Sequence, residues 1–494
     1  MGQVDRRTVL GIGAVAGATT LLGGFAPGAV AAVGPAGPDR PKGLKGRAFR
    51  PGDPGYAEQI KVYNLARIPA PGLIIAAAAP SDVQIAVRLA ARRGAPVAVL
   101  ATGHQASVPI GRDAIMVTTR AMRGVTVDAR RRVARAEAGA LWQHVTDKAL
   151  PAGLAPLTGS TPIIGVVGYT LGGGLSPTLG RKYGYAADHV RSIDVVGADG
   201  RLRTVTPKND PELFFGLRGG KSNFGLVTAI EFDLFPVTTF YGGSIFFAGR
   251  DAERLLHAYR RWVRTVPDAM SSSVALLRLP DVEAVPAPLR GKFVASLRIA
   301  YLGRADTGAA LVKPLRSVAT PILDAVAEQP YAAYPAIHGD PVDPAPGYDR
   351  TGLLRELTAE TVEALIAVAG PRAAYPLTMV EIRHLGGGLA RQPKVPNAVS
   401  HRDAAFSLFT IGVAGPAGAA AVRRAEAEVI RRLRPWSTGG MYLNFMGTAE
   451  ASADAVRHAY RPAVYRRLQR LKQRVDPHNT FRLNHNIPPG PARP

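Results

Sequence analysis

The sequence predicts an α+β protein with an N-terminal α/β part and a later part built on an antiparallel sheet flanked by helices. Three observations support this fold class. An amphipathic pattern at 83–93 leads into an apolar run at 96–100, which is typical of a helix followed by a buried strand. Two alternating runs at 193–196 and 202–206 are joined by a short Gly-containing turn, which is typical of a hairpin. After about Tyr241, strand patterns alternate with Ala- and Arg-rich helices.

Residues that typically begin or end helices mark the elements of the N-terminal part. Ser81 and Asp82 precede the helix at 83–93, and Gly94 ends it. Further elements are expected as strands at 115–119, 125–128 and 132–137 and as a helix near 141–149. The alternation of helices and strands indicates two α/β subdomains.

The later part and the C-terminus are predicted in the same way. Strands are expected at 293–301 and 405–413 and a helix at 417–433, and a last helix at 461–475 ends at Asp476-Pro477. The predicted division of the chain is an export signal at 1–31, a linker at 32–55, a domain of two α/β subdomains at 56–240, an antiparallel-sheet domain at 241–438, and a segment at 439–494 that returns to the first domain.

The composition excludes several classes of protein. The 494 residues include no cysteine, which excludes disulfides, thiolate metal sites, iron–sulfur clusters and cysteine nucleophiles. The 61 Lys and Arg outnumber the 37 Asp and Glu, and the formal charge of +24 would attract nucleic acid or an anionic membrane. Because the basic residues are spread along helices and form no nucleic-acid-binding motif, we expect a solvated basic surface and no specific nucleic-acid partner.

The N-terminus has the pattern of an export signal. Arg6 and Arg7 precede a Gly-interrupted apolar stretch that ends near Phe25, and small residues follow at 29–31. Paired arginines indicate the twin-arginine export machinery, which carries folded proteins and therefore suits an enzyme that loads a cofactor before export. We expect a secreted protein with no membrane span after signal cleavage. An ordinary secretory signal and an uncleaved anchor are the alternatives.

Several catalytic motifs are absent or incomplete. The stretch 216–222 resembles a phosphate-binding P-loop, but its spacing is short by one residue, which argues against ATP hydrolysis. The histidines have no HExxH or paired helical spacing, so no metal site is predicted. No GxSxG turn is present to position a serine nucleophile.

Two stretches of small residues would let a ligand lie directly against the main chain. The turn at 101–105 follows the strand at 96–100, and its amides can approach a ligand closely. The stretch 161–175 contains three consecutive glycines, which suit close contact with a flat or negatively charged group such as a flavin ring or a pyrophosphate. It lacks the spaced glycines of a Rossmann fingerprint, and a plain tight loop is the alternative.

Taken together, four segments resemble the berberine-bridge-enzyme-like branch of the vanillyl-alcohol-oxidase superfamily, whose FAD-binding domain is of the PCMH type. The four segments are 80–104, 161–188, 214–235, and a C-terminal pair formed by Tyr442-Leu443-Asn444-Phe445 and 476–487. The similarity extends from about Gly52 to Ile487. It implies a PCMH-type two-part FAD-binding domain, an antiparallel-sheet substrate domain flanked by helices, and FAD as the cofactor.

The resemblance also places the cofactor. His104 matches the histidine that is bonded to the flavin 8α-methyl group, and a free histidine beside a non-covalent flavin is the alternative. Thr161 stands where doubly linked members have cysteine, so at most one covalent bond is possible. The other residues implied to contact FAD are Thr102, Gly103, Gln105, Thr161, Gly165, Gly168, Tyr169, Gly172, Gly173, Gly174, Val227, Asn444 and Asn484.

The catalytic residue implied by the resemblance is Tyr442, in a Tyr-x-Asn strand facing the flavin. A tyrosine with an ordinary pKa near ~10 is a poor base at neutral pH, so a positive charge or coupled hydride transfer must assist it. A buried aromatic that only shapes the pocket is the alternative. Glu381 and Arg383 share one face of an expected strand and are assigned to the substrate side, with a structural ion pair as the alternative.

The implied activity is that of an FAD-linked oxidase acting on CH–OH groups. A sugar, an oligosaccharide or a secondary metabolite would pass hydride to flavin N5, and molecular oxygen would be reduced to hydrogen peroxide. Ile164 occupies the position that gates oxygen in related enzymes, and its shape leaves the electron acceptor open. A dehydrogenase using another acceptor and an inactive flavin-binding or basic surface-binding protein are the alternatives.

Overall fold

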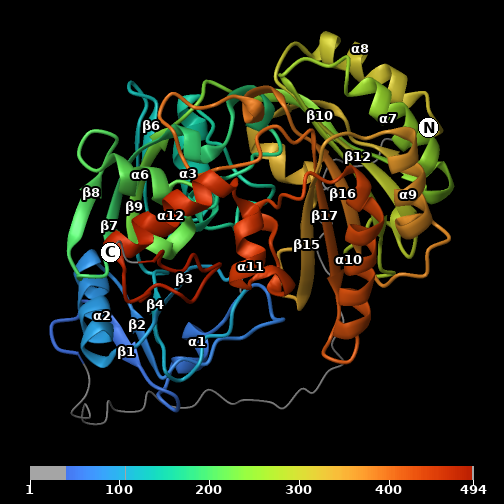
Figure 1. Ribbon diagram of the computed structural model, residues 1–494. Helices are drawn as coiled ribbons and strands as arrows, with labels where there is room; N and C mark the ends of the chain where they lie inside the picture. The colour runs from blue at the N-terminus through green and yellow to red at the C-terminus, as the bar shows by residue number, and fades with distance from the viewer. Residues whose placement is uncertain (1–40, 106, 492–494) are drawn as a thin grey trace, which may run out of the picture.

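The computed structural model describes residues 41–105 and 107–491, and three sheets organise it (Figure 1). The predicted export signal at 1–31 lies outside the described residues. Among the residues that are described, no helix is long and apolar enough to cross a lipid bilayer.

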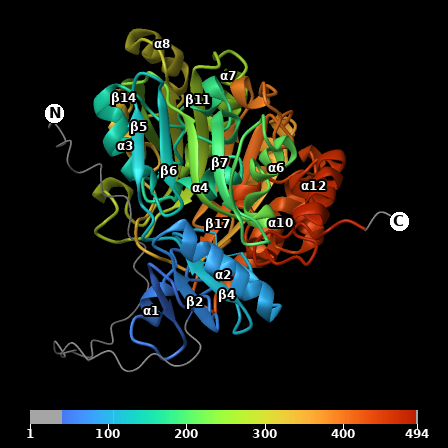
Figure 2. The same cartoon turned by 90° about the vertical axis from the view of Figure 1, so that its left-hand side faces the viewer.

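The first sheet has four strands in the order β1-β2-β4-β3. The strands β2, β4 and β3 are parallel, and the helix α2 packs against them. Figure 2 shows this sheet and α2 as a separate layer at one end of the molecule. The bounds are β1 Arg47–Phe49, α1 Tyr56–Gln59, β2 Leu73–Ala76, α2 Pro80–Arg93, β3 Val97–Leu100 and β4 Ile115–Thr118.

Part of the segment expected to be a linker, 32–55, belongs to this sheet. The strand β1 pairs antiparallel with β2. The buried carboxylate of Asp82 accepts hydrogen bonds from the backbone amides of Lys45 and Gly46, at 2.7 and 2.9 Å, and so fixes the start of β1 beside α2. The linker prediction was wrong here because three strand residues among prolines and glycines give too short a periodic signal.

The second sheet has five antiparallel strands in the order β5-β6-β9-β7-β8. Its core combines Trp142, Phe214 and Leu468 from three helices. The bounds are β5 Val125–Asp128, β6 Val133–Glu137, α3 Trp142–Ala149, α4 Val166–Leu171, α5 Gly180–Tyr183, β7 Val190–Val196, β8 Leu202–Val205, α6 Pro211–Leu217 and β9 Leu226–Asp233.

The third sheet has eight antiparallel strands, seven of them in the order β13-β10-β12-β11-β16-β17-β15, with β14 paired to β10. The helices α7, α8, α9 and α10 cover its outer face in Figure 1. The bounds are β10 Thr239–Ala248, α7 Ala252–Trp262, β11 Met270–Arg278, β12 Phe293–Tyr301, α8 Ala305–Arg316, β13 Leu323–Asp324, β14 Ala327–Pro330, β15 Gly347–Leu354, α9 Ala359–Ala369, β16 Met379–His384, β17 Phe406–Val413 and α10 Ala419–Leu433.

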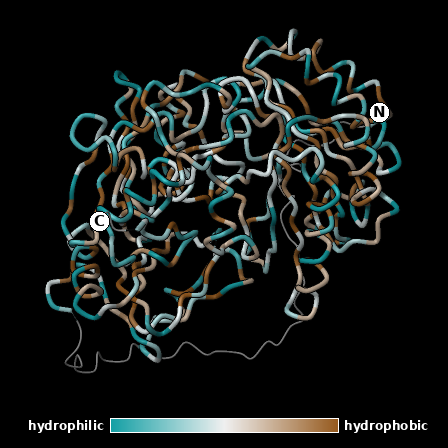
Figure 3. The backbone as a smooth tube through the Cα atoms, in the orientation of Figure 1, coloured by the Kyte–Doolittle hydropathy of each residue, from teal (hydrophilic) through white to brown (hydrophobic). Residues whose placement is uncertain are grey.

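The C-terminal segment returns to the second sheet. Its helices are α11 Ala453–Val456 and α12 Pro462–Val475. In Figure 1, α12 lies beside α6, and Leu468 and Leu471 join the core of the second sheet. In Figure 3 hydrophobic and hydrophilic stretches alternate along the chain, and the hairpin that ends with β8 is mostly hydrophilic.

The segment around Tyr442 is not the strand that the sequence led us to expect. Leu443–Phe445 form a turn of 3₁₀-helix. The carbonyls of Leu443 and Met446 accept hydrogen bonds from the Gln105 side-chain amide, at 2.8 and 2.9 Å. A side chain distant in the sequence therefore replaces a neighbouring strand, and local periodicity carries no signal of this.

Candidate active site

A cavity of about 550 Å³ lies where the three sheets meet. Its walls come from the loop after β3, the start of α4, the chain around Lys221, the strands β16 and β17, and the C-terminal segment. The predicted site residues that line it are Thr102, Gly103, His104, Gln105, Thr161, Ile164, Gly165, Gly168, Tyr169, Val227, Glu381, Arg383, Tyr442, Asn444 and Asn484. The fold thus brings most of the predicted residues to one place.

The three consecutive glycines, 172–174, do not line this cavity. A Cβ on Gly172 would collide with Asn444, and one on Gly174 would lie 2.5 Å from the Cβ of Ala186. Gly173 lies against the Tyr442 ring. These glycines let the chain pass directly behind the cavity wall, so the tight-loop alternative describes their packing better than the expected contact with a cofactor.

The loop after β3 holds His104 rigidly. Gly103 has φ +73°, and a Cβ there would lie 2.6 Å from the Cβ of Val62, so only glycine fits. The His104 ring stacks on Tyr63, with centroids 4.0 Å apart and 23° between the planes. Burial lowers the pKa of His104 to about 4, against the opposing effect of its hydrogen bond to the backbone of Ile163. The imidazole is therefore neutral at physiological pH.

The start of α4 exposes main chain to the cavity. No heavy atom lies within 4 Å of the position that a Cβ on Gly168 would occupy, and for Gly165 the nearest atom is 3.6 Å away, on Thr102. Both glycines line the cavity, so a flat group can approach the backbone there.

Tyr442 is buried at 6% exposure and is held by defined partners. Its hydroxyl oxygen accepts a hydrogen bond of 2.8 Å from the backbone amide of Leu175. Burial raises its pKa above the ordinary value, whereas the hydrogen bonds from Leu175 and Asn444 and the charge of Arg383 lower it. Tyr442 is therefore protonated at rest, because burial and the nearby Tyr185 outweigh the three groups that favour the ionised form.

Glu381 is the centre of a buried charge network. One of its oxygens accepts hydrogen bonds from Ser273 at 2.7 Å and from Arg298 at 2.8 Å, and the other accepts one from Arg383 at 2.9 Å. Although burial opposes ionisation, the two guanidinium groups hold the pKa of Glu381 well below its usual range. Glu381 is thus an ionised partner in the structural ion pair that was the alternative, and it also lines the cavity.

Lys221 and Asp349 are site residues that sequence reasoning missed. Both line the cavity, and the Lys221 ammonium donates a hydrogen bond to the side-chain oxygen of Gln105. Lys221 has φ +54°, a left-handed conformation that is uncommon for lysine. Burial lowers the pKa of Lys221 to about 7 and raises that of Asp349 to about 7.

Three other cavity residues were missed. They are Tyr63 from the segment before β2, Arg298 from β12 and His338 from the loop before β15. Only Lys221 lay in a stretch that the sequence marked, the incomplete P-loop, where the glycine spacing drew attention to phosphate chemistry. The others carry no motif, because they lie far apart in the sequence and meet only in the folded chain.

The cavity fits a flavin nucleotide. Two glycines present bare backbone to it, its walls combine apolar and polar side chains, and the buried side-chain oxygen of Asn484 has no hydrogen-bond partner among the described residues. An FAD would lie against His104, Gly165, Gly168 and Asn484. No group of three or more His, Asp or Glu suited to a metal ion occurs in 41–105 or 107–491.

Comparison with known families agrees with this geometry. Residues 71–206 match the family described as FAD binding domain, and residues 441–488 match the family described as berberine and berberine like. The chain is a berberine-bridge-enzyme-like FAD-linked oxidoreductase. The two matches cover the wall that holds His104 and the segment that holds Tyr442.

Relatives of this oxidoreductase span nearly its whole length. It is 26% identical to (R)-6-hydroxynicotine oxidase of Paenarthrobacter nicotinovorans, over 91% of this chain and 98% of that protein. The structure of 6-hydroxy-D-nicotine oxidase from Arthrobacter nicotinovorans superposes with a TM-score of 0.78 at 25% identity, covering 90% of this chain and 98% of that one. A chitooligosaccharide oxidase shares the fold, with a TM-score of 0.75 at 18% identity over 90% of this chain and 98% of that one.

Proposed function

We propose that this oxidoreductase oxidises an alcohol group of a small molecule to a carbonyl or lactone, with molecular oxygen as the final electron acceptor and hydrogen peroxide as the product. The observation that carries this proposal is the single cavity that brings His104, Tyr442 and Arg383 together. When bound, FAD supplies the acceptor for the hydride equivalent and passes the electrons to oxygen.

His104 is the proposed attachment point of FAD. It is neutral, so a ring nitrogen is available for bonding, and the stacked Tyr63 ring restricts its movement. Because the chain has no cysteine, a second covalent link through a cysteine thioether is excluded.

Tyr442 is the proposed group that orients the substrate hydroxyl and takes its proton. The amide of Leu175 and the side chain of Asn444 donate hydrogen bonds that stabilise a tyrosinate, and Arg383 adds a favourable charge. Because burial outweighs these effects at rest, the rate of substrate oxidation should rise with pH.

Export by the twin-arginine machinery is part of the proposal. It is supported by Arg6 and Arg7 and by the small residues at 29–31, all of which lie outside the described residues. Replacing both arginines with lysine should retain the protein in the cytoplasm, and a secreted double variant would contradict this route.

The activity is tested by anaerobic reduction of the flavin. The purified enzyme is mixed with sugars, oligosaccharides, aromatic alcohols and hydroxy acids, and its visible absorbance is followed. We expect at least one alcohol to bleach the flavin, and air should restore the colour with one peroxide formed per turnover. Flavin that no alcohol bleaches would contradict the proposal, and colour restored only by a quinone would assign a dehydrogenase.

A further inference from the structure

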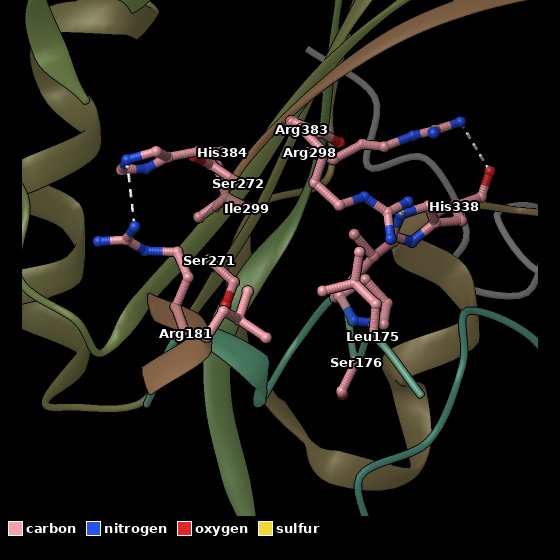
Figure 4. A pocket seen from close by; sticks show the side chains of 14 residues that line it. Leu175, Ser176, Arg181, Ser271, Ser272, Arg298, Ile299, His338, Arg383 and His384 are labelled. Atoms are coloured by element: carbon pink, nitrogen blue, oxygen red, sulfur yellow. Dashed lines mark hydrogen bonds between the residues drawn. The ribbon is translucent and has the colours of Figure 1, made fainter. Parts of the chain in front are cut away.

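Three donor groups form a positively charged corner of the cavity, which we call the donor corner: Arg298, His338 and Arg383. All three also line a small adjoining pocket with Ser271, Ser272 and Ser273. Figure 4 shows them gathered on one side of that pocket, while Arg181 pairs with His384 on the other. Their side chains are at most 10% exposed.

The donor corner has one more positive charge than negative. Arg298 and Arg383 share a single carboxylate, that of Glu381, at 2.8 and 2.9 Å. The His338 ring lies 3.9 Å from the same carboxylate, but burial and the two arginines hold its pKa well below the ordinary value, so it is neutral. A buried surplus charge is costly unless an anion accompanies it.

The donor corner also has hydrogen atoms without acceptors. Among the described residues, the Nε atoms of Arg298 and Arg383 are buried and have no hydrogen-bond partner. Arg383 lies 3.3 Å from Nε2 of His338, and because a guanidinium only donates, Nε2 accepts. The single proton of the neutral ring is then on Nδ1, which also has no partner.

Among the described residues, Glu381 is the acidic side chain that pairs with these donors, and both of its oxygens already accept hydrogen bonds. Asp340 and Asp343 line the same cavity beside Tyr63, and they raise the pKa of that tyrosine. The donor corner therefore offers donors and positive charge with no free acceptor. A carboxylate meets both needs, since it accepts several hydrogen bonds and cancels the charge.

We propose that the donor corner binds a carboxylate of the substrate, so that the natural substrate is a hydroxy acid or another anionic alcohol. This inference rests on the proposed function, because it names the substrate class of that same cavity. A neutral alcohol would satisfy some donors and leave the surplus charge in place. The other role for the charge of Arg383 is support of ionised Tyr442 alone.

The test compares two probes of equal shape, benzoate and benzamide, on the flavin-loaded enzyme. Each is titrated at pH 7 and constant ionic strength, and binding is followed by the flavin absorbance and by the unfolding temperature, which does not depend on the flavin signal. We expect benzoate to bind at least about tenfold more tightly than benzamide, which corresponds to about 1.4 kcal/mol.

The Arg383→Gln variant should lose this preference, and Arg383→Lys should keep part of it. Arg431→Gln serves as the control, since Arg431 lies on the exposed side of α10 and pairs with Glu428. Equal binding of the two probes by the wild-type enzyme would overturn the inference. A preference that survives in Arg383→Gln would also overturn it.

The two proposals fail in different ways. If alcohols bleach the flavin while benzoate and benzamide bind equally, the carboxylate site is wrong and the proposed function stands. If benzoate is preferred and no alcohol bleaches the flavin, the donor corner is an anion site and the proposed oxidation is wrong.

Discussion

The wall of the cavity formed by 101–105 and the start of α4 exposes main chain and glycine, whereas the facing wall on β16 carries buried charges. On the first wall, His104 is neutral and is held by ring stacking. On the second, Glu381 and Arg383 belong to an ionised network. A wall of bare backbone suits a large flat cofactor, and a wall of fixed charges suits selection of a small ligand. The difference indicates a division between cofactor binding and substrate choice.

The largest expected effect concerns Tyr442, which lies between the two walls. Tyr442→Phe should lower the rate of flavin reduction by on the order of 10²- to 10⁴-fold, because the proton acceptor is removed. Since the pKa of Tyr442 is raised, the wild-type rate should increase with pH, and the variant should lose this dependence. The measurement is anaerobic stopped-flow reduction across pH 6–10.

Tyr185→Phe is the matched control for this variant. The Tyr185 ring stacks near Tyr442, with centroids 6.1 Å apart, but Tyr185 does not line the cavity. Its replacement should leave both the rate and its pH dependence close to wild type. An unchanged pH dependence in Tyr442→Phe would assign the proton to another group.

A second prediction concerns two buried acids outside the cavity, Glu426 on α10 and Glu450 in the C-terminal segment. Burial raises the pKa of Glu426 and of Glu450 to about 8. Their stabilising effect is therefore complete below the unfolded pKa near ~4.3 and is lost as the pH rises through 8. Each unit of pKa difference corresponds to about 1.4 kcal/mol, so the free energy of unfolding should fall by a few kcal/mol between pH 5 and 9.

Glu426→Gln tests this dependence. Glutamine keeps the shape and cannot ionise, so the variant should show a shallower decline with pH in urea unfolding. Glu428→Gln is the control, since Glu428 is paired on the surface with Arg431 and Arg432. Identical pH profiles for Glu426→Gln and wild type would mean that Glu426 does not carry the buried proton.

The glycine wall predicts two different outcomes for the same substitution. Gly103→Ala should destabilise the fold by at least about 1–2 kcal/mol, because alanine resists φ +73° and its Cβ would press on Val62. Gly168→Ala should leave the fold intact, since its Cβ would project into open space on the cavity wall, but should reduce the FAD content. The measurements are thermal unfolding and the ratio of flavin to protein absorbance.

The smallest expected effect is at Ile164. Its Cδ1 atom lies 2.9 Å from where a Cβ on Gly159 would be, so it closes the cavity wall there. Ile164→Val removes one methyl group and should raise the rate of flavin reoxidation by oxygen severalfold, with substrate reduction unchanged. A slower reoxidation in air-saturated buffer would show that Ile164 does not limit oxygen access.

The two walls also differ in how far the sequence predicts them. The glycines and the segment around His104 form recognisable sequence motifs, because only small residues let the backbone lie close to other groups there. Arg298 leaves none, because it meets Glu381 only when β11, β12 and β16 pair, and His338 leaves none, because it reaches Glu381 from a distant loop. The sheet class and strand 293–301 were predicted correctly, and the Tyr442 strand was wrong because Gln105 replaces a strand partner.

The most direct test of the account is the absorption spectrum of the purified protein before and after acid precipitation. The proposed covalent bond between FAD and His104 predicts that the yellow colour stays with the pellet, and that His104→Ala releases it while His257→Ala, a control on α7, does not. Flavin released from the wild-type protein would contradict the covalent link. Protein that holds no flavin in either fraction would contradict the oxidoreductase assignment as a whole.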